Sequence, residues 1–326
     1  MPQPKNLHRC AILDDYQNVA LKMADWQSLA GEVEFTVFNR PLGSVEEIAS
    51  ALNGFDMIVL TRERTRFPRQ LIDALPDLRL IVSTGMRNWM LDIMAARERG
   101  IVACGTPTIG SSTTTIAIGL IIELTRHIGQ ESERMKGGAF WQSTLGPDIE
   151  GKTLGVIGLG RLGTRVSKIA KAMGMKVIAW SQNLTAERCK EAGVDQAGSK
   201  EELLSAADIV TIHVVLGPRT RGLIGSKELA LMKPTAYLVN TARGPIVDEA
   251  ALIAALREKR IAGAGLDVYD TEPLPLDHPL RQLDNVVLSP HLGYVTQENF
   301  RGSYGGERTT LSSLRSGWSS GSGSVS

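Results

Sequence analysis

One segment constrains this chain more than any other: a buried strand predicted at 154–157 that runs into Gly158-x-Gly160-x-x-Gly163 and then into a helix at 164–173. In such a turn the first glycine permits the tight bend, the second lets phosphates approach the backbone, and the third lets helix and strand pack closely. The amino end of the helix adds free N–H groups and a positive dipole. The segment therefore predicts a dinucleotide site, the plainer alternative being an ordinary strand–helix turn.

A second strand predicted at 176–180 bears on the choice of cofactor. An acidic residue at its end would bind the ribose hydroxyls of NAD and repel the 2′-phosphate of NADP. Here the strand runs into Ser181, Gln182 and Asn183, and the nearest arginine is Arg188. The cofactor is therefore NAD or NADP, with NADP favoured unless Ser181 binds the ribose without discriminating. The cofactor-binding residues expected in these two turns are Gly158, Gly160, Arg161, Leu162, Gly163, Ser181 and Gln182.

Composition excludes several classes of protein. The chain has 326 residues, 43% of them hydrophobic, and a formal net charge of +1, with no basic patch to indicate a nucleic-acid partner. No run of 18 apolar residues indicates a membrane span, and the amino terminus lacks a signal-peptide core. Cys10, Cys104 and Cys189 are too widely spaced for a metal motif, which favours free thiols in the cytoplasm and no metal.

Alternating apolar runs and helical patterns predict two doubly wound α/β domains. We expect a substrate domain at 1–104, a nucleotide-binding domain at 105–293 and a return segment at 294–326. A long helix at 113–134 is expected to connect the domains. Other helices are expected at 45–52, 68–75, 201–206, 226–231 and 249–259. Strands are expected at 9–13, 34–38, 57–61, 78–83, 101–104, 154–157, 176–180, 209–213, 236–240, 262–267 and 286–289.

The residues after Tyr304 form a Ser/Gly-rich tail that is expected to be disordered. Leu311, Leu314 and Trp318 have helical spacing, so one short helical turn is expected there at most. The abrupt change in composition suggests a reading frame altered near Tyr304, with the loss of a helix that would cover the first domain.

Three polar side chains follow predicted strands, at the edge where ligands bind in open α/β sheets. Arg243 and His291 come just after two strands, and Glu272 lies in a proline-stiffened loop after another. Arginine binds carboxylates bidentately, and histidine exchanges protons near neutral pH. Each has a plainer interpretation, as a surface arginine, an exposed carboxylate and a structural histidine. Together, beside a dinucleotide loop, they favour a catalytic set.

The chain resembles the D-isomer-specific 2-hydroxyacid dehydrogenases over nearly its whole length. The resemblance rests on four motifs in the family's order and spacing, GLGRLG at 158–163, VNTARGPIVD at 239–248, GLDVYDTEP at 265–273 and SPHLG at 289–293. It implies that Arg243 binds the substrate's carboxylate and carbonyl, that Glu272 hydrogen-bonds the histidine, and that His291 transfers the proton. It also implies a Rossmann domain inserted in a flavodoxin-like substrate domain, and a homodimer.

The resemblance implies further contacts. Substrate-binding positions are Arg62, Arg64, Gly85, Met86 and Arg87, and the remaining cofactor positions are Thr113, His213, Val214, Val215, Thr241, Ala242 and Asp267. The sequence departs from the family where Ser181 replaces the ribose-binding acid, where Thr115 replaces a glutamate, and in the tail.

These features predict a cytoplasmic NAD(P)-dependent oxidoreductase that interconverts a D-2-hydroxy acid and a 2-keto acid. The substrate itself stays open, from glyoxylate to bulky keto acids. The main alternative is a sensor that resembles the family's corepressors and binds NAD(H) without turnover. A dehydrogenase of formate or phosphite is a more distant alternative, because its substrate lacks the carbon chain that the substrate loop is suited to hold.

Overall fold

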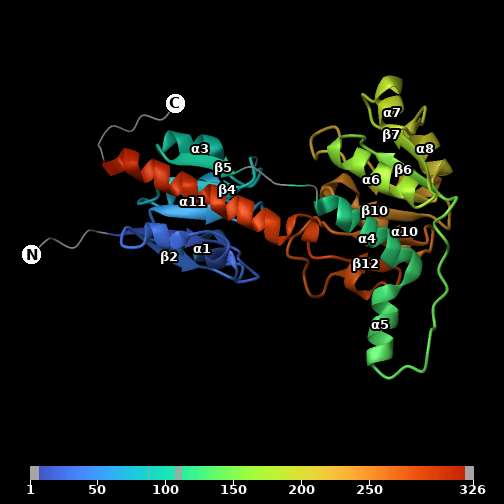
Figure 1. Ribbon diagram of the computed structural model, residues 1–326, viewed down its shortest axis with the longest axis horizontal. Coiled ribbons are helices and arrows are strands. Elements are labelled where there is room, and N and C mark those ends of the chain that lie inside the picture. The colour runs from blue at the N-terminus through green and yellow to red at the C-terminus, as the bar shows by residue number, and fades with distance from the viewer. Residues whose placement is uncertain (1–6, 87, 107–109, 111, 320–326) are drawn as a thin grey trace, which may run out of the picture. The chain divides into compact units, whose positions relative to one another are not determined.

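The protein was studied as a computed structural model that describes residues 7–86, 88–106, 110 and 112–319, with the backbone alone at 307 and 312–319. The chain divides into two compact units. Unit 1 comprises 1–110 and 296–326, and unit 2 comprises 111–295. The sequence had suggested boundaries at 104 and 293. The first unit is thus discontinuous in sequence and the second is continuous (Figure 1).

Unit 1 contains a five-stranded parallel sheet in the order β2-β1-β3-β4-β5. This is the order of flavodoxin-like sheets, with the switch in strand order between β1 and β3. Every residue of β3 and β4 is buried, because helices cover both faces of the sheet. The strands are β1 (His8–Ile12), β2 (Val33–Val37), β3 (Met57–Leu60), β4 (Leu80–Thr84) and β5 (Val102–Thr106).

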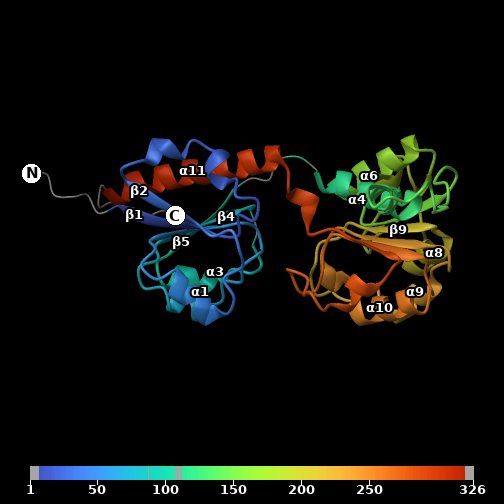
Figure 2. The same cartoon turned by 90° about the horizontal axis from the view of Figure 1, so that it is seen from below.

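Figure 2 shows the two helical layers of unit 1, with α1 and α3 on one face of the sheet and the long helix α11 on the other. The helices are α1 (Val45–Ala51), α2 (Arg69–Asp73), α3 (Ile93–Glu98) and α11 (Gln297–Ser319), with short 3-10 turns η1 (Ala20–Lys22) and η2 (Trp26–Leu29). Ser44 and Glu47 form a capping box that starts α1.

The prediction of a tail without a closing helix is wrong for the described residues, because α11 continues to Ser319 and packs on β4 and β5. Its buried side chains include Phe300, Tyr304 and Leu311, which lie four and seven residues apart and so share one face. Tyr304 is fully buried, and its hydroxyl lies 3.4 Å from Thr61 Oγ1. The apolar face thus stabilises the helix although the composition does not favour it. Residues 320–326 lie outside the described part.

Unit 2 contains a seven-stranded parallel sheet in the order β12-β11-β10-β9-β6-β7-β8. Counted from β6, this is the Rossmann order with one added strand, and the switch lies between β6 and β9. Both sheets are parallel and doubly wound, which confirms the predicted fold class. The strands are β6 (Thr153–Ile157), β7 (Lys176–Trp180), β8 (Asp195–Gln196), β9 (Ile209–Ile212), β10 (Tyr237–Asn240), β11 (Gly263–Leu266) and β12 (Val286–Leu288).

In unit 2, α4 and α6 cover one face of the sheet and α9 and α10 cover the other (Figure 2). The helices are α4 (Ser112–Arg126), α5 (Ile128–Lys136), α6 (Arg161–Ala172), α7 (Ala186–Ala192), α8 (Lys200–Ala206), α9 (Ser226–Leu231) and α10 (Glu249–Arg257). Short 3-10 turns are η3 (Gly244–Ile246), η4 (Pro279–Gln282) and η5 (Leu292–Tyr294). A core of buried aliphatic side chains lies on each face.

The single helix predicted at 113–134 is wrong, because the chain breaks it into α4 and α5 at His127. His127 adopts a left-handed conformation with φ of 51°, which interrupts the helical hydrogen bonds. The Glu123 carboxylate accepts the N–H of Gly129 at 3.0 Å and so supplies the partner that the first turn of α5 needs. The break therefore coincides with a left-handed residue and with a side-chain cap supplied from the last turns of α4.

Candidate active site

The predicted site residues of unit 2 gather at one edge of its sheet. The glycine turn follows β6, Ser181 follows β7, His213 follows β9, Arg243 follows β10, Asp267 follows β11 and His291 follows β12. Because all seven strands are parallel, their carboxyl ends share this edge, which is where open α/β sheets bind ligands.

The three glycines of the turn differ in what surrounds them. Gly158 has φ of 100°, and a Cβ there would lie 2.8 Å from the backbone carbonyl of His213. A Cβ on Gly163 would collide with the carbonyl oxygen of Gly158, which shows how closely α6 packs on the turn. Gly160 faces open space. It is also the N-cap of α6 and gives the helix no side-chain cap, so the first amides can bind an anion.

His291 and Glu272 form a close polar pair at this edge. His291 Nδ1 lies 2.6 Å from Glu272 Oε2, and the N–H of Tyr269 donates to Oε1 of the same carboxylate at 2.9 Å. His291 is in the left-handed region with φ of 53°, immediately before η5. The ring of Tyr294 meets the imidazole edge to face at 5.3 Å. Since Glu272 occupies Nδ1, Nε2 is the nitrogen left to exchange a proton with a ligand.

Glu272 stays ionised although its surroundings partly shield it from water. Burial raises the pKa of its carboxyl, but the hydrogen bond and charge of His291, the N–H of Tyr269 and the charge of Arg243 outweigh it, so the pKa lies below the ordinary 4.5. The carboxylate is therefore an anion at neutral pH. An anion at Nδ1 fixes the orientation of the imidazole ring.

Asp267 shapes the turn that carries His291. It is fully buried and accepts hydrogen bonds from Ser289 Oγ at 2.6 Å, from Leu292 N at 2.7 Å and from Gly293 N. Burial raises its pKa even though these bonds oppose the change. The sequence predicts that Asp267 lies beside the nicotinamide, and in the structure both of its carboxylate oxygens accept hydrogen bonds from the protein. Its observed role is to position the histidine turn.

The carbonyl of Gly293, in the same turn, is held from the start of α4. Ser112 Oγ donates to it at 2.7 Å and Thr113 Oγ1 at 3.0 Å. Thr113, expected near the nicotinamide ring, thus fixes the turn beyond His291. The sequence analysis had not singled out Ser112, although a hydroxyl at a helix start is a common anchor.

Arg243 leaves β10 on a braced backbone. The side-chain amide of Asn240 donates to the carbonyl of Arg243 at 2.9 Å and accepts the N–H of Ala242 at 3.0 Å. Arg243 Nη1 donates to the carbonyl of Ala242 at 2.7 Å. Thr241 lies between Asn240 and Ala242 in the sequence, and its Oγ1 is buried without a hydrogen-bond partner in the described residues. A buried hydroxyl without a partner is what a bound ligand would relieve, so this atom fits a cofactor site here.

The residues after β9 form an apolar wall. Val215 is 70% exposed and Val214 is half-buried. His213 Nε2 lies 3.0 Å from Thr211 Oγ1, and burial lowers its pKa to about 4. His213 is therefore neutral at pH 7 and unsuited to acid catalysis. After β7, Ser181 is half-buried and Gln182 is exposed.

The predicted substrate residues lie in unit 1, at the carboxyl ends of β3 and β4. Arg62 is left-handed with φ of 57°, and its N–H donates to Thr84 Oγ1 at 2.7 Å. Gly85 has φ of 102° and packs against the Arg62 guanidinium. Met86 is 70% exposed. Arg87 lies outside the described residues.

Arg64 rests on two residues that the sequence analysis missed. Its guanidinium carbon lies 4.4 Å from the centre of the Tyr16 ring, and Nη1 donates to the carbonyl of Asp14. The Asp14 carboxylate is buried and accepts the Thr65 hydroxyl at 2.6 Å, and burial raises its pKa. Two adjacent aspartates after an apolar strand were the available signal for this cluster.

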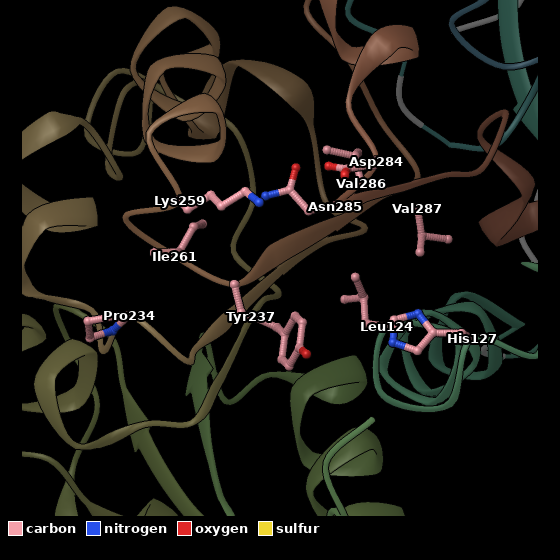
Figure 3. A pocket seen from close by; sticks show the side chains of 11 residues that line it. Leu124, His127, Pro234, Tyr237, Lys259, Ile261, Asp284, Asn285, Val286 and Val287 are labelled. Atoms are coloured by element: carbon pink, nitrogen blue, oxygen red, sulfur yellow. The ribbon is translucent and has the colours of Figure 1, made fainter. Parts of the chain in front are cut away.

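A cavity of about 390 Å³ in unit 2 contains none of the predicted site residues (Figure 3). It lies at the amino ends of β10 and β12 and beside the end of α4, and its lining includes Leu124, His127, Tyr237, Ile261, Val286 and Val287. Because the chemistry gathers at the opposite ends of these strands, we do not assign the catalytic site to this cavity.

The described residues offer no other obvious chemistry. No group of three His, Cys, Asp or Glu residues among them is placed to hold a metal ion. None of their helices is long and apolar enough to cross a membrane. Cys10, Cys104 and Cys189 are free thiols, and burial raises the pKa of the last two.

Comparison with known proteins places these features in one family. The model of the D-isomer specific 2-hydroxyacid dehydrogenase NAD binding domain matches residues 118–293. The chain is 40% identical over 255 residues to D-3-phosphoglycerate dehydrogenase of Methanocaldococcus jannaschii, which covers 78% of this chain and 48% of that one. It is 40% identical over 242 residues to glyoxylate reductase of Aeropyrum pernix, covering 72% of each.

Solved structures agree along most of the chain. The phosphoglycerate oxidoreductase of Vibrio cholerae superposes with a TM-score of 0.91 at 31% identity, covering 95% of this chain and 99% of that one. In contrast, the chain spans about half the length of the phosphoglycerate dehydrogenases that it matches in sequence.

Proposed function

Because this chain belongs to the D-isomer specific 2-hydroxyacid dehydrogenase family, whose members are NAD(P)-dependent oxidoreductases, we propose that it interconverts a small D-2-hydroxy acid and the corresponding 2-keto acid. The observation that carries the proposal is the 2.6 Å contact between His291 and Glu272 at the edge that also holds Arg243 and the glycine turn. An acid–base pair beside a dinucleotide turn suits the reduction of a carbonyl group.

The three side chains have distinct proposed roles in the reducing direction. Arg243 binds the substrate's carboxylate and polarises its ketone, because a guanidinium forms paired hydrogen bonds to adjacent oxygens. Protonated His291 gives its Nε2 proton to the carbonyl oxygen as that oxygen gains charge. Anionic Glu272 holds the imidazole by Nδ1 and stabilises its charged form. In the oxidising direction, neutral His291 removes the hydroxyl proton.

The cofactor that fits is NAD or NADP. Gly160 leaves open space in front of the amino end of α6, and Thr241 Oγ1 is buried without a partner in the described residues. Gly158, Gly160 and Gly163 would hold the pyrophosphate, and Thr241 and Ala242 would lie beside the nicotinamide. When bound, the reduced nicotinamide supplies the hydride for the carbonyl carbon. Val214 and Val215 would cover the adenine.

Unit 1 is proposed to contribute binding rather than proton transfer. The left-handed Gly85 and the exposed Met86 would offer backbone N–H groups to the substrate's carboxylate. Arg62 and Arg64 would hold any further anionic group. Relatives named as reductases of glyoxylate and hydroxypyruvate and as phosphoglycerate dehydrogenases make small 2-keto acids with or without a phosphate the first substrates to test.

Steady-state assays with a panel of 2-keto acids and both reduced cofactors test the proposal. We expect sustained oxidation of NADH or NADPH with at least one small keto acid. Arg243→Ala should lower kcat and raise KM together, because the arginine both binds and polarises the substrate. A change in KM alone would mean that Arg243 binds the substrate but does not polarise its ketone. Cofactor binding without any turnover would instead favour the nucleotide sensor.

We also propose that the protein is a homodimer formed through unit 2. The segment after α5 exposes three large apolar side chains within six residues, with Phe140 and Leu145 both 99% exposed and Trp141 59% exposed. Such side chains seldom face water in a monomer. A second copy related by a two-fold axis would cover these side chains.

Light scattering tests the dimer. The wild-type protein should have the mass of two chains, and Phe140→Ser with Leu145→Ser should shift it toward one. Leu276→Ser is the matched control, because Leu276 is 90% exposed but lies in a different loop. A stable, active wild-type monomer would refute the proposal. The free thiols of the chain support a reducing compartment such as the cytoplasm as its location.

A further inference from the structure

The turn after β7 lacks the charge that usually selects NAD. In sheets of this order, a carboxylate at the end of that strand binds both ribose hydroxyls and repels a 2′-phosphate. Here Ser181, Gln182 and Asn183 follow Trp180, and all three are neutral hydrogen-bonding side chains. The N–H of Leu184 donates to the carbonyl of Ser181 at 3.0 Å, which closes a tight turn into α7. Nothing acidic therefore occupies this strand end.

A cation reaches this region from α7. Arg188 Nη2 donates to Thr164 Oγ1 at 3.3 Å, and Thr164 lies in the first turn of α6, directly after the glycine turn. The N-cap of α7 is Thr185, so Arg188 lies in that helix's first turn, close to the loop that starts at Ser181. The guanidinium thus contacts the first turn of α6 from a helix that begins four residues after Ser181.

The present partners of Arg188 leave it able to bind a phosphate. Its Nη1 lies 3.2 Å from Glu191 Oε2, but the two side chains are 44% and 67% exposed. An exposed pair of this kind contributes little, whereas a phosphate dianion offers stronger, charge-assisted hydrogen bonds. Arg165 adds a second exposed cation on α6, while Glu187 and Glu191 on α7 oppose it. The exposed charges on α6 and α7 thus include both signs, so a moderate preference is expected.

We propose that this chain prefers NADPH to NADH, with Arg188 binding the 2′-phosphate of the adenosine ribose and Ser181 donating a hydrogen bond to it. The inference rests on the proposed dinucleotide-dependent function and adds the residue that selects the cofactor. Arg188 is a binding residue here and takes no part in proton transfer.

Direct binding tests the assignment without relying on turnover. The dissociation constants of NADPH and NADH are measured with the full-length protein by the change in nicotinamide fluorescence. Arg188→Ala should weaken NADPH about tenfold or more, the cost of one charge-assisted contact, and change NADH by less than about threefold. Lys190→Ala is the matched control, because it removes the same charge from an exposed position on the same helix. It should leave both constants nearly unchanged.

A second variant tests the strand end itself. Ser181→Asp should reverse the preference, because its carboxylate binds the ribose hydroxyls and repels the 2′-phosphate. Wild-type protein that binds NADH as tightly as NADPH would overturn this inference while leaving the dehydrogenase function intact. Equal weakening of both cofactors by Arg188→Ala would also overturn it, since that result indicates only a structural role. Failure to bind either cofactor would overturn the proposed function and this inference together.

Discussion

The first strands of the two sheets end in equivalent places with opposite chemistry. β1 and β6 each lie beside the point where strand order reverses. After β6 comes a glycine turn whose backbone amides can bind an anion. After β1 come Asp14 and Asp15, whose side chains are 2% and 1% exposed. Both sheets thus have a strand end beside the switch in strand order. The residues of the turn that follows determine which charged groups lie there.

In unit 1 the arginines follow β3, the neighbour of β1 in the sheet. Arg62 and Arg64 follow β3, and Asp14 helps to hold Arg64 through its carbonyl. Unit 2 instead has glycines after β6 and the three proposed polar positions Arg243, Asp267 and His291 after β10, β11 and β12. The comparison teaches that two sheets of one class can carry different polar groups at their strand ends, with the proposed proton donor in unit 2.

The largest expected effect tests that division. His291→Ala should lower turnover by about a hundred- to ten-thousandfold, because it removes the only proposed proton donor. Cofactor affinity should persist, since the glycine turn is untouched. Single-turnover reduction of a keto acid, combined with NADPH titration, measures both. Near-normal turnover would mean that the proton comes from elsewhere, and unit 1 would become a candidate.

The closing helix should matter to unit 1 alone. Leu311→Ala should destabilise the protein by about 2–4 kcal/mol, because Leu311 is 1% exposed and its loss leaves a cavity. Cofactor affinity, a property of unit 2, should be unchanged below the unfolding transition. Urea denaturation gives the stability, with the 90% exposed Leu276→Ala as control. If the two variants were equally stable, α11 would contribute little to unit 1.

A smaller effect separates backbone strain from crowding in the glycine turn. Gly158→Ala places a Cβ 2.8 Å from the His213 carbonyl at φ of 100° and should cost about 1–3 kcal/mol and weaken the cofactor. Gly151→Ala, at φ of 75° with open space around it, should show only the conformational cost. Thermal melts and cofactor titration compare them. Equal losses would show that crowding is unimportant here.

The smallest effect concerns the ionisation of Glu272. A depressed carboxyl pKa means that the folded state favours the anion, so its stabilising contribution is present above 4.5 and is lost as the pH falls through the lower folded value. Glu272→Gln should therefore cost about 1 kcal/mol near pH 7, and the difference from wild type should shrink below pH 4.5. Stability measured against pH checks this. If the stability difference between the variant and wild type grew as the pH fell, the folded state would raise the pKa of Glu272 instead of lowering it.

How much of the structure could be predicted depended on how far apart in the sequence the interacting residues lie. The glycine turn, the strands and the polar residues after them could be predicted, because strand alternation and glycine spacing are local patterns. The break at His127 was missed for a different reason, because the apolar pattern continues through the left-handed residue and through the Glu123 cap of the next helix. The Ser/Gly-rich composition after Tyr304 predicts disorder, whereas the spacing of Phe300, Tyr304 and Leu311 favours a helix. The structure shows that the helix forms. The cluster at Asp14 depends on Thr65, which is distant in sequence.

The discontinuity of unit 1 has a consequence for how the chain is made. On the ribosome, β1 to β5 emerge first, and domains tend to fold as they emerge. Yet the helix that covers β4 and β5 belongs to 297–319 and is synthesised after all of unit 2. Until then the nascent sheet carries an uncovered apolar face, a natural substrate for chaperones. Unit 2, continuous from 111 to 295, can complete its core while that face of unit 1 is still uncovered.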